Sequence, residues 1–375
     1  MLNHSKVAAP DPDAIEVVAL GTLPPPVTGM TLLTEQVVRG LQAGGPLRLL
    51  NWSTGLSKKG LKFRIARLLR VMRSYFTLLR RGRASGAKLY LVANSSAGLF
   101  LTALFVGLAR RLGYQVYLHH HVYFYIDQHD WRMGWIDRRM GSTGVHVVHC
   151  EKMMTDFRRR YDSVCQFEFI LPSVVSSPIG RPRELSTGPF RLGHLSNLTL
   201  AKGLDLVVDT FERILNSGHD LRLDLAGPIR RGRARRLLDR TLSNHPDRVR
   251  YHGPLYGDSK VEFFAHIDAF VFPSRSESWG IVLHEAMCAG VPVIAYDRGC
   301  AEVVLGDQGG LLIQANANFV ELAAAQVVHW IANPQAYHQV SQKAIEQAEL
   351  LNREGPRTMA EFVAHVYSKA AGPKI

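Results

Sequence analysis

The alternation of strand-like and helix-like patterns limits the fold of this chain more than any other feature. Short apolar runs lie at 15–20, 88–93, 115–119 and 145–149, and longer amphipathic stretches separate them. Apolar runs of this length are typical of strands that are buried on both faces. When such strands alternate with helices, the sheet is parallel and helices cover both of its faces. We therefore predict an α/β fold.

One interruption of this alternation divides the chain into two lobes. Residues 172–189 are rich in Ser, Pro and Gly and form the best linker candidate. Strands are predicted after it at 190–195, 221–226, 249–251, 269–272 and 292–295, with helices at 204–216, 233–242 and 281–289. The 375 residues suffice for two such lobes, which we place at 1–173 and 190–354 with a linker at 174–189. A cleft between them would be lined by the carboxyl ends of both sets of strands.

Cysteine spacing and the apolar segments limit where the protein works. The four cysteines are widely spaced and form no Cys-x-x-Cys pair; they are Cys150, Cys165, Cys288 and Cys300. This spacing argues against a disulfide framework or a structural zinc site and fits a reducing cytoplasm. The first twenty residues have no long apolar core, so we expect no signal peptide. The apolar run at 97–109 is shorter than the roughly 20 residues of a membrane helix, so we expect a soluble protein.

The positive charge of the chain is concentrated in one segment. Net charge is +13, and residues 58–83 hold ten Lys or Arg and no acidic residue. Apolar side chains recur there at spacings of three and four: Leu61, Ile65, Leu68, Leu69, Met72, Phe76 and Leu79. The pattern predicts a helix with one apolar and one cationic face. A solvated basic face, an anionic membrane or lipid-phosphate acceptor, and nucleic acid all fit this helix, and we favour the membrane.

The segment 272–295 carries the clearest chemical information. A strand ends at Pro273, a polar loop follows, and a helix begins near Gly280. The first backbone N–H groups of a helix lack internal acceptors and, with the helix dipole, form a site for an anion such as a diphosphate. Gly280 has no side chain to keep phosphate away, and the N–H groups of Ile281 and Val282 would face it. The sequence therefore predicts a diphosphate site here.

The same segment resembles a known family motif. Glu277 and Glu285 are separated by seven residues, and Ala286-Met287 and Gly290-Val291-Pro292 follow. This pattern resembles the Glu-x7-Glu signature of glycosyltransferase family four, the retaining nucleotide-sugar enzymes of the GT-B fold. Trp279 and Cys288 stand where the family has Phe and Ala. The resemblance implies two Rossmann-like lobes facing a central cleft, with Glu277 near the transferred sugar and Glu285 on the donor ribose. It also implies that the tail, 355–375, packs back on the first lobe.

The resemblance extends upstream in the second lobe. The loop ending in Lys202-Gly203 is similar to the family's loop after the first strand of this lobe, and an ammonium there would neutralise the leaving diphosphate without a metal. Asn197 stands where many members have Arg; Arg230 or Arg231, after Gly227, is a candidate replacement. The segment 252–256 resembles the loop that holds the nucleobase through the backbone around Leu255.

In the first lobe the resemblance rests on a loop and three histidines. Residues 24–30 match the family's Gly-rich loop, with Gly29 as the one glycine retained. His119 and His121 would share one side of an extended segment, opposite His120. Acidic or Cys ligands do not flank them at suitable spacing, so we expect no metal. The resemblance implies that His120 or His121 contacts the sugar.

These observations together predict a cytoplasmic, metal-independent, retaining glycosyltransferase without cofactor, peripheral on the inner face of the membrane through 58–83. Its donor would be a UDP- or GDP-sugar, and its acceptor a glycan or lipid-linked saccharide in cell-surface polysaccharide biosynthesis. A GT-B epimerase or phosphorylase is one alternative: an epimerase needs acid and base pairs near the sugar, and a phosphorylase needs a pyridoxal lysine, which we cannot place. A basic nucleic-acid-binding protein with a degenerate enzyme fold is another. Intact Glu277, Lys202 and Glu285 argue against it, so we expect no nucleic-acid partner.

Overall fold

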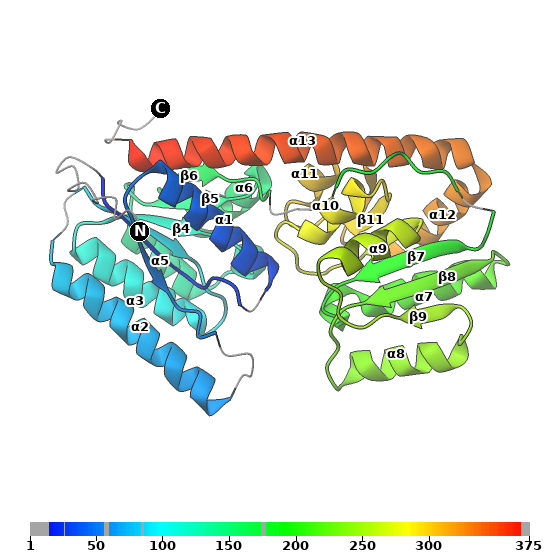
Figure 1. Ribbon diagram of the computed structural model, residues 1–375, viewed down its shortest axis with the longest axis horizontal. Helices are drawn as coiled ribbons and strands as arrows, with labels where there is room; N and C mark the ends of the chain where they lie inside the picture. The colour runs from blue at the N-terminus through cyan, green and yellow to red at the C-terminus, as the bar shows by residue number, and fades with distance from the viewer. Residues whose placement is uncertain are drawn as a thin grey trace, which may run out of the picture.

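A computed structural model gives the fold. It describes residues 15–25, 27–55, 60–83, 86–173, 178–185 and 187–368. Two α/β lobes lie side by side and one long helix, α13 (Pro334–Tyr367), runs along both of them (Figure 1). The predicted linker falls between the lobes, with residues 174–177 and 186 outside the described residues.

The first lobe is built on a parallel sheet of six strands in the order β2-β1-β3-β4-β5-β6. The strands are β1 (Val17–Gly21), β2 (Leu47–Asn51), β3 (Lys88–Val92), β4 (Gln115–His119), β5 (Val145–Val148) and β6 (Gln166–Phe169). All residues of β1, β3 and β5 are buried, as expected of strands covered by helices on both faces. The edge strands β2 and β6 are only partly buried, and their mixed composition left them unpredicted.

Helices cover both faces of this sheet. They are α1 (Gly29–Gly44), α2 (Leu61–Arg81), α3 (Gly98–Arg111), α4 (Phe124–Asp127), α5 (Trp131–Met140) and α6 (Glu151–Tyr161). The side chain of Thr28 caps α1 by accepting a hydrogen bond from the N–H of Thr31. The helix α2 confirms the predicted amphipathic helix, whose Lys58 and Lys59 lie outside the described residues. Across the described parts of the chain, the helices are all too short or too polar to cross a membrane.

The second lobe has its own parallel sheet, in the order β12-β11-β10-β7-β8-β9. Its strands are β7 (Phe190–Leu195), β8 (Leu221–Ala226), β9 (Val249–Tyr251), β10 (Ala269–Phe272), β11 (Val293–Tyr296) and β12 (Gly310–Ile313). The helices are η1 (Leu200–Lys202), α7 (Leu204–Asn216), α8 (Arg233–Asn244), α9 (Asp258–His266), α10 (Ile281–Cys288), α11 (Ala301–Leu305) and α12 (Phe319–Ala332). The sequence placed every strand except β12 to within one residue.

The helix α13 belongs to both lobes. Near its start, Tyr337 is buried in the core of the second lobe. Near its end, Met359, Phe362 and Val366 are buried in a core that includes residues of β1 and α1. The predicted tail is thus the last part of a continuous 34-residue helix rather than a separate element.

A disulfide also joins the lobes. Cys150 directly precedes α6 in the first lobe, Cys300 directly precedes α11 in the second, and their sulfurs are bonded. Next to this bridge, Lys152 Nζ lies 2.7 Å from the carboxylate of Asp297. The expectation against disulfides was wrong because 150 residues separate the two cysteines, and such a distance carries no spacing signal. The other two cysteines are free and buried.

Replacing one partner of this disulfide should destabilise the protein. A cross-link that closes a long loop restricts the unfolded chain, so Cys150→Ser should lower the free energy of unfolding by about 2–4 kcal/mol. Urea denaturation without reductant would show this as a lower midpoint. Wild-type protein in reductant is the control and should match the variant. Coincident curves for oxidised wild type and variant would show that the bridge adds no stability.

Candidate active site

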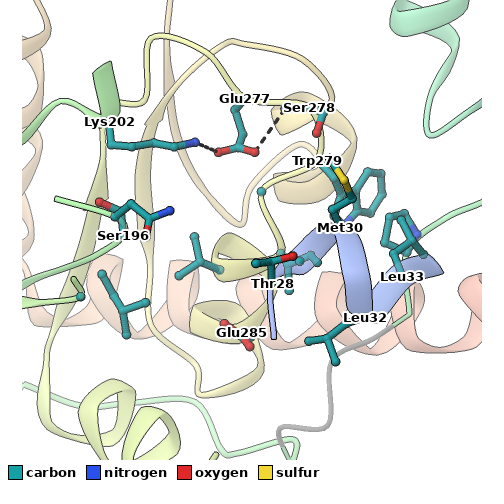
Figure 2. Close-up of a pocket in the computed structure, with 18 of the residues that line it drawn as sticks. Thr28, Met30, Leu32, Leu33, Ser196, Lys202, Glu277, Ser278, Trp279 and Glu285 are labelled. Atoms are coloured by element: carbon teal, nitrogen blue, oxygen red, sulfur yellow. Dashed lines mark hydrogen bonds and ion pairs between the residues drawn. The ribbon is translucent and has the colours of Figure 1, made fainter. Parts of the chain in front are cut away.

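A pocket of about 390 Å³ lies between the two lobes. Its walls come from the carboxyl ends of strands in both sheets: His149 follows β5, Ser196 follows β7, and Phe272 ends β10. Open parallel sheets bind ligands at this edge, and the volume suits a small molecule. Figure 2 shows the pocket with Lys202, Glu277 and Glu285 around it.

Two helix starts face each other in this pocket. The helix α1 begins at Gly29 and α10 begins at Ile281; a Cβ on Gly29 would lie 3.1 Å from Ile281 Cδ1. Gly280 precedes α10 with a φ of +78°, which favours glycine. The N–H groups at the start of α10, including those of Ile281 and Val282, lack acceptors within the helix. With two helix dipoles directed at it, the pocket favours an anion.

Two glycines hold the loops of the second lobe in close contact. Gly227 has a φ of +122°, and a Cβ there would lie 1.7 Å from the carbonyl oxygen of Ser196. Gly203 has a φ of +80°, and its Cβ would lie 2.3 Å from the carbonyl oxygen of Pro273. The loops after β7, β8 and β10 therefore meet, and they bring Asn197 and Gly227 into the pocket wall.

Lys202 and Glu277 form an ion pair in the pocket. The Lys202 ammonium donates to Glu277 Oε2 at 2.8 Å (Figure 2). It also donates to the carbonyl oxygen of Ser276 at 3.2 Å. Arg275 anchors the same loop by donating to both carboxylate oxygens of Asp205. The structure thus places a cation and a carboxylate, paired with each other, in the wall of the pocket that also contains the start of α10.

A second ion pair involves a residue that the sequence did not reveal. The Lys260 ammonium, from α9, donates to both carboxylate oxygens of Glu285. Burial raises the pKa of the Glu285 carboxyl, and the Lys260 charge opposes that rise. Lys260 and Leu255 both line the pocket. Lys260 belongs to no motif, and only the packing of α9 against α10 brings it to Glu285.

Some histidines of the first lobe face the pocket, and others do not. His121 and His149 line the pocket, and the ring of His119 lies 4.1 Å from that of His121 and 5.1 Å from that of His149. His149 was missed, although it follows β5 just as His121 follows β4, the neighbouring strand. Burial lowers the pKa of all three, that of His149 to about 4, so they are neutral at pH 7.

Two predicted site residues are not in the pocket wall. His120 is fully buried on the opposite side, where its ring nitrogens face Tyr125 Oη at 3.0 Å and His146 Nδ1 at 2.7 Å. His146 in turn contacts Asp137 at 2.9 Å, so His120 belongs to a buried hydrogen-bonded chain. Arg231 is exposed to solvent and does not line the pocket. Of the two histidines predicted to contact the sugar, only His121 lines the pocket.

The pocket histidines also offer a set of metal ligands. His119, His121 and His149 each bring one ring nitrogen to within 4.8 Å of the others. Neutral imidazoles accept hydrogen bonds and bind metals through the same lone pair. These nitrogens could therefore hold a metal ion or hydrogen-bond a ligand's hydroxyl groups.

Comparison with known proteins matches the second lobe to an enzyme family. Residues 179–347 match the model of the glycosyl transferases group 1. The chain is 32% identical over 116 residues to the GDP-mannose-dependent alpha-mannosyltransferase of Mycolicibacterium smegmatis, covering 31% of this chain and 29% of that protein. It is 31% identical over 102 residues to the O-antigen biosynthesis glycosyltransferase WclY of Escherichia coli, covering 27% of each. These matches span less than a third of the relatives' length.

Solved structures match the whole fold. Sucrose-phosphate synthase from Thermosynechococcus elongatus has a TM-score of 0.71 at 14% identity, covering 94% of this chain and 98% of that one. Anabaena Alr3699/HepE in complex with UDP and glucose has a TM-score of 0.62 at 16% identity, covering 92% and 100%. These likenesses confirm the predicted GT-B fold of two Rossmann-like lobes, and the second lobe is similar to the glycosyl transferases group 1.

Proposed function

We propose that this protein is a retaining glycosyltransferase that moves a sugar from a UDP- or GDP-sugar to a lipid-linked saccharide in cell-surface polysaccharide biosynthesis. One observation carries the proposal: the start of α10, Lys202, Glu277 and Glu285 converge on one pocket between the lobes. The GDP-mannose dependence of the M. smegmatis relative, the UDP in the Anabaena structure and the O-antigen role of the E. coli relative agree with it. The Glu-x7-Glu motif is the basis for assigning retention of configuration.

In this proposal each part of the pocket binds one part of the donor. The diphosphate lies at the start of α10, where Lys202 moves from the Glu277 carboxylate to the leaving phosphate. Negative charge that develops on the leaving group is then met by an ammonium and by fixed N–H groups. Glu285 accepts hydrogen bonds from the ribose, and the backbone around Leu255 holds the base. Gly29 has no side chain, which allows the first lobe to approach the donor phosphate closely.

Removing either charged group should abolish most of the transfer. We expect Lys202→Ala and Glu285→Ala each to cost roughly 2–4 kcal/mol of transition-state stabilisation, a loss of about 30- to 1,000-fold in kcat/KM. Radiolabelled sugar transfer from a panel of UDP- and GDP-sugars to a lipid-diphosphate-linked saccharide measures this. Lys343→Ala and Glu321→Ala, at exposed residues outside the pocket lining, are matched controls. Turnover near the wild-type rate in both pocket variants would refute the proposal.

The proposal includes independence of divalent metals. The diphosphate charge is balanced by Lys202 and by the starts of α1 and α10, so no Mg²⁺ or Mn²⁺ is required to bridge it. We expect the rate of transfer to be unchanged after dialysis against EDTA. A rate that falls on chelation and returns with Mg²⁺ or Mn²⁺ would contradict this part of the proposal.

The surface of α2 supports a membrane-bound acceptor. The helix is held to the lobe by buried Val71 and Leu78. The other apolar side chains are exposed, with relative accessibilities of 42–73%: Leu61, Ile65, Leu68, Leu69, Met72, Phe76 and Leu79. Sequence left open whether these side chains pack on the lobe; in the structure a large part of each is accessible to solvent. Exposed apolar residues beside arginines fit an anionic bilayer surface, so we propose that the enzyme acts peripherally on the inner face of the membrane.

Binding to vesicles tests this surface. Each Lys or Arg near an anionic surface contributes about 1 kcal/mol, and salt screens the attraction over about 8 Å at physiological ionic strength. We expect co-sedimentation with vesicles of phosphatidylglycerol and phosphatidylcholine, weakened by salt and by replacing Arg64, Arg67, Arg73 and Arg80 with Gln. The same change at Arg233, Arg235, Arg236 and Arg240 of α8 is the matched control. Equal sedimentation with neutral vesicles would remove the membrane from the proposal.

A further inference from the structure

Three ring nitrogens around the pocket have no hydrogen-bond partner in the described part of the chain. They are Nε2 of His119, Nε2 of His121 and Nε1 of Trp279, and all three are buried. Trp279 is 3% exposed and lines the pocket (Figure 2). His121 also lines it. A buried polar group without a partner is costly, and most such groups in proteins are satisfied. Two of these nitrogens belong to residues of the pocket wall, His121 and Trp279, which indicates that a ligand supplies the missing hydrogen bonds.

The hydrogen-bonding role of His149, in the same wall, is fixed by its backbone contact. Its Nδ1 lies 3.0 Å from the carbonyl oxygen of Ile170, which can only accept, so Nδ1 carries the proton. Because Nδ1 carries the single proton of the neutral ring, Nε2 is presented as an acceptor. Trp279 offers only a donor, Nε1–H, and its ring lies 6.2 Å from that of His149. The ring that carries the donor and the ring that carries the acceptor are thus neighbours in the pocket wall.

We propose that His149 and Trp279 form a subsite that recognises a hydroxyl group of the transferred sugar. A hydroxyl donates its hydrogen to His149 Nε2 while its oxygen accepts from Trp279 Nε1. A carboxylate or phosphate has no hydrogen for His149, so the subsite selects an uncharged, hydroxylated ring. This subsite rests on the proposed function, because a sugar is expected here only if the pocket binds a nucleotide-sugar donor.

The position of the subsite agrees with this assignment. Trp279 is two residues from Glu277, the carboxylate proposed to face the sugar. Between them, Ser278 Oγ donates to the backbone oxygen of His121 at 2.9 Å and so connects the loop to the histidine wall. Lys202 and the start of α10 bind the diphosphate from the second lobe. Changes in the subsite should therefore alter the affinity for the sugar and leave the affinity for the nucleoside diphosphate unchanged.

Two variants remove one polar atom each. Trp279→Phe keeps an aromatic ring and removes the donor. His149→Asn keeps an amide donor for Ile170 and removes the Nε2 acceptor. Trp135→Phe, on α5 outside the pocket lining, is the matched control. If His149→Asn fails to fold, Trp279→Phe still tests the subsite.

Calorimetry with UDP, GDP, UDP-glucose, UDP-galactose, UDP-N-acetylglucosamine and GDP-mannose measures the effect. For the best-bound sugar, we expect each variant to lower the ratio of nucleotide-sugar affinity to nucleoside-diphosphate affinity about tenfold, as for one lost hydrogen bond. Affinity for UDP or GDP alone should stay at the wild-type value, and Trp135→Phe should match wild type in both.

The outcomes separate this inference from the proposed function. A wild-type protein that binds none of these nucleotides refutes the donor assignment itself. Nucleotide binding with an unchanged ratio in both variants overturns the subsite alone. One equivalent of zinc per chain, lost on replacing His149, would also overturn it, because the metal would then occupy Nε2.

Discussion

The functional pocket depends on the helix α13, which packs into the cores of both lobes. At about 1.5 Å per residue its 34 residues extend roughly 50 Å, long enough to run along both sheets. Tyr337 at one end and Phe362 at the other are fully buried in different lobes, so each lobe stabilises half of the helix. The pocket takes residues from both lobes, and neither lobe alone contains the anion site, the carboxylates and the histidines. The Cys150–Cys300 disulfide also holds the two lobes together, beside the pocket.

The sequence predicts the parts of this fold that are fixed by local burial. Strands of the second lobe such as β8 and β10 are buried runs bounded by turn residues, and their ends were placed within one residue. The edge strands β2 and β6 are only partly buried, so no uniform apolar run marks them. Long-range contacts leave no local pattern, which explains why the bridge between the lobes was missed.

The same distinction holds for the site. Glu277, Glu285 and Lys202 lie in continuous motifs, and the structure brings them to one pocket. Lys260 reaches Glu285 only through packing between helices, so no motif contains it. His149 could have been found, because β4 and β5 are adjacent in a parallel sheet and the residues after them share one edge.

The charges of the pocket explain how an anionic donor can be received. Both carboxylates are held by lysines, Glu277 by Lys202 and Glu285 by Lys260. A partly buried carboxylate left without its cation is strongly destabilising, so these pairs keep the open pocket stable. On the proposed function, a diphosphate takes over Lys202 at the moment when a sugar reaches Glu277, and its hydroxyl groups replace the lost ammonium. Lys202 therefore stays paired with Glu277 until a donor binds. The diphosphate of that donor then pairs with Lys202, and its sugar supplies new hydrogen-bond partners for Glu277.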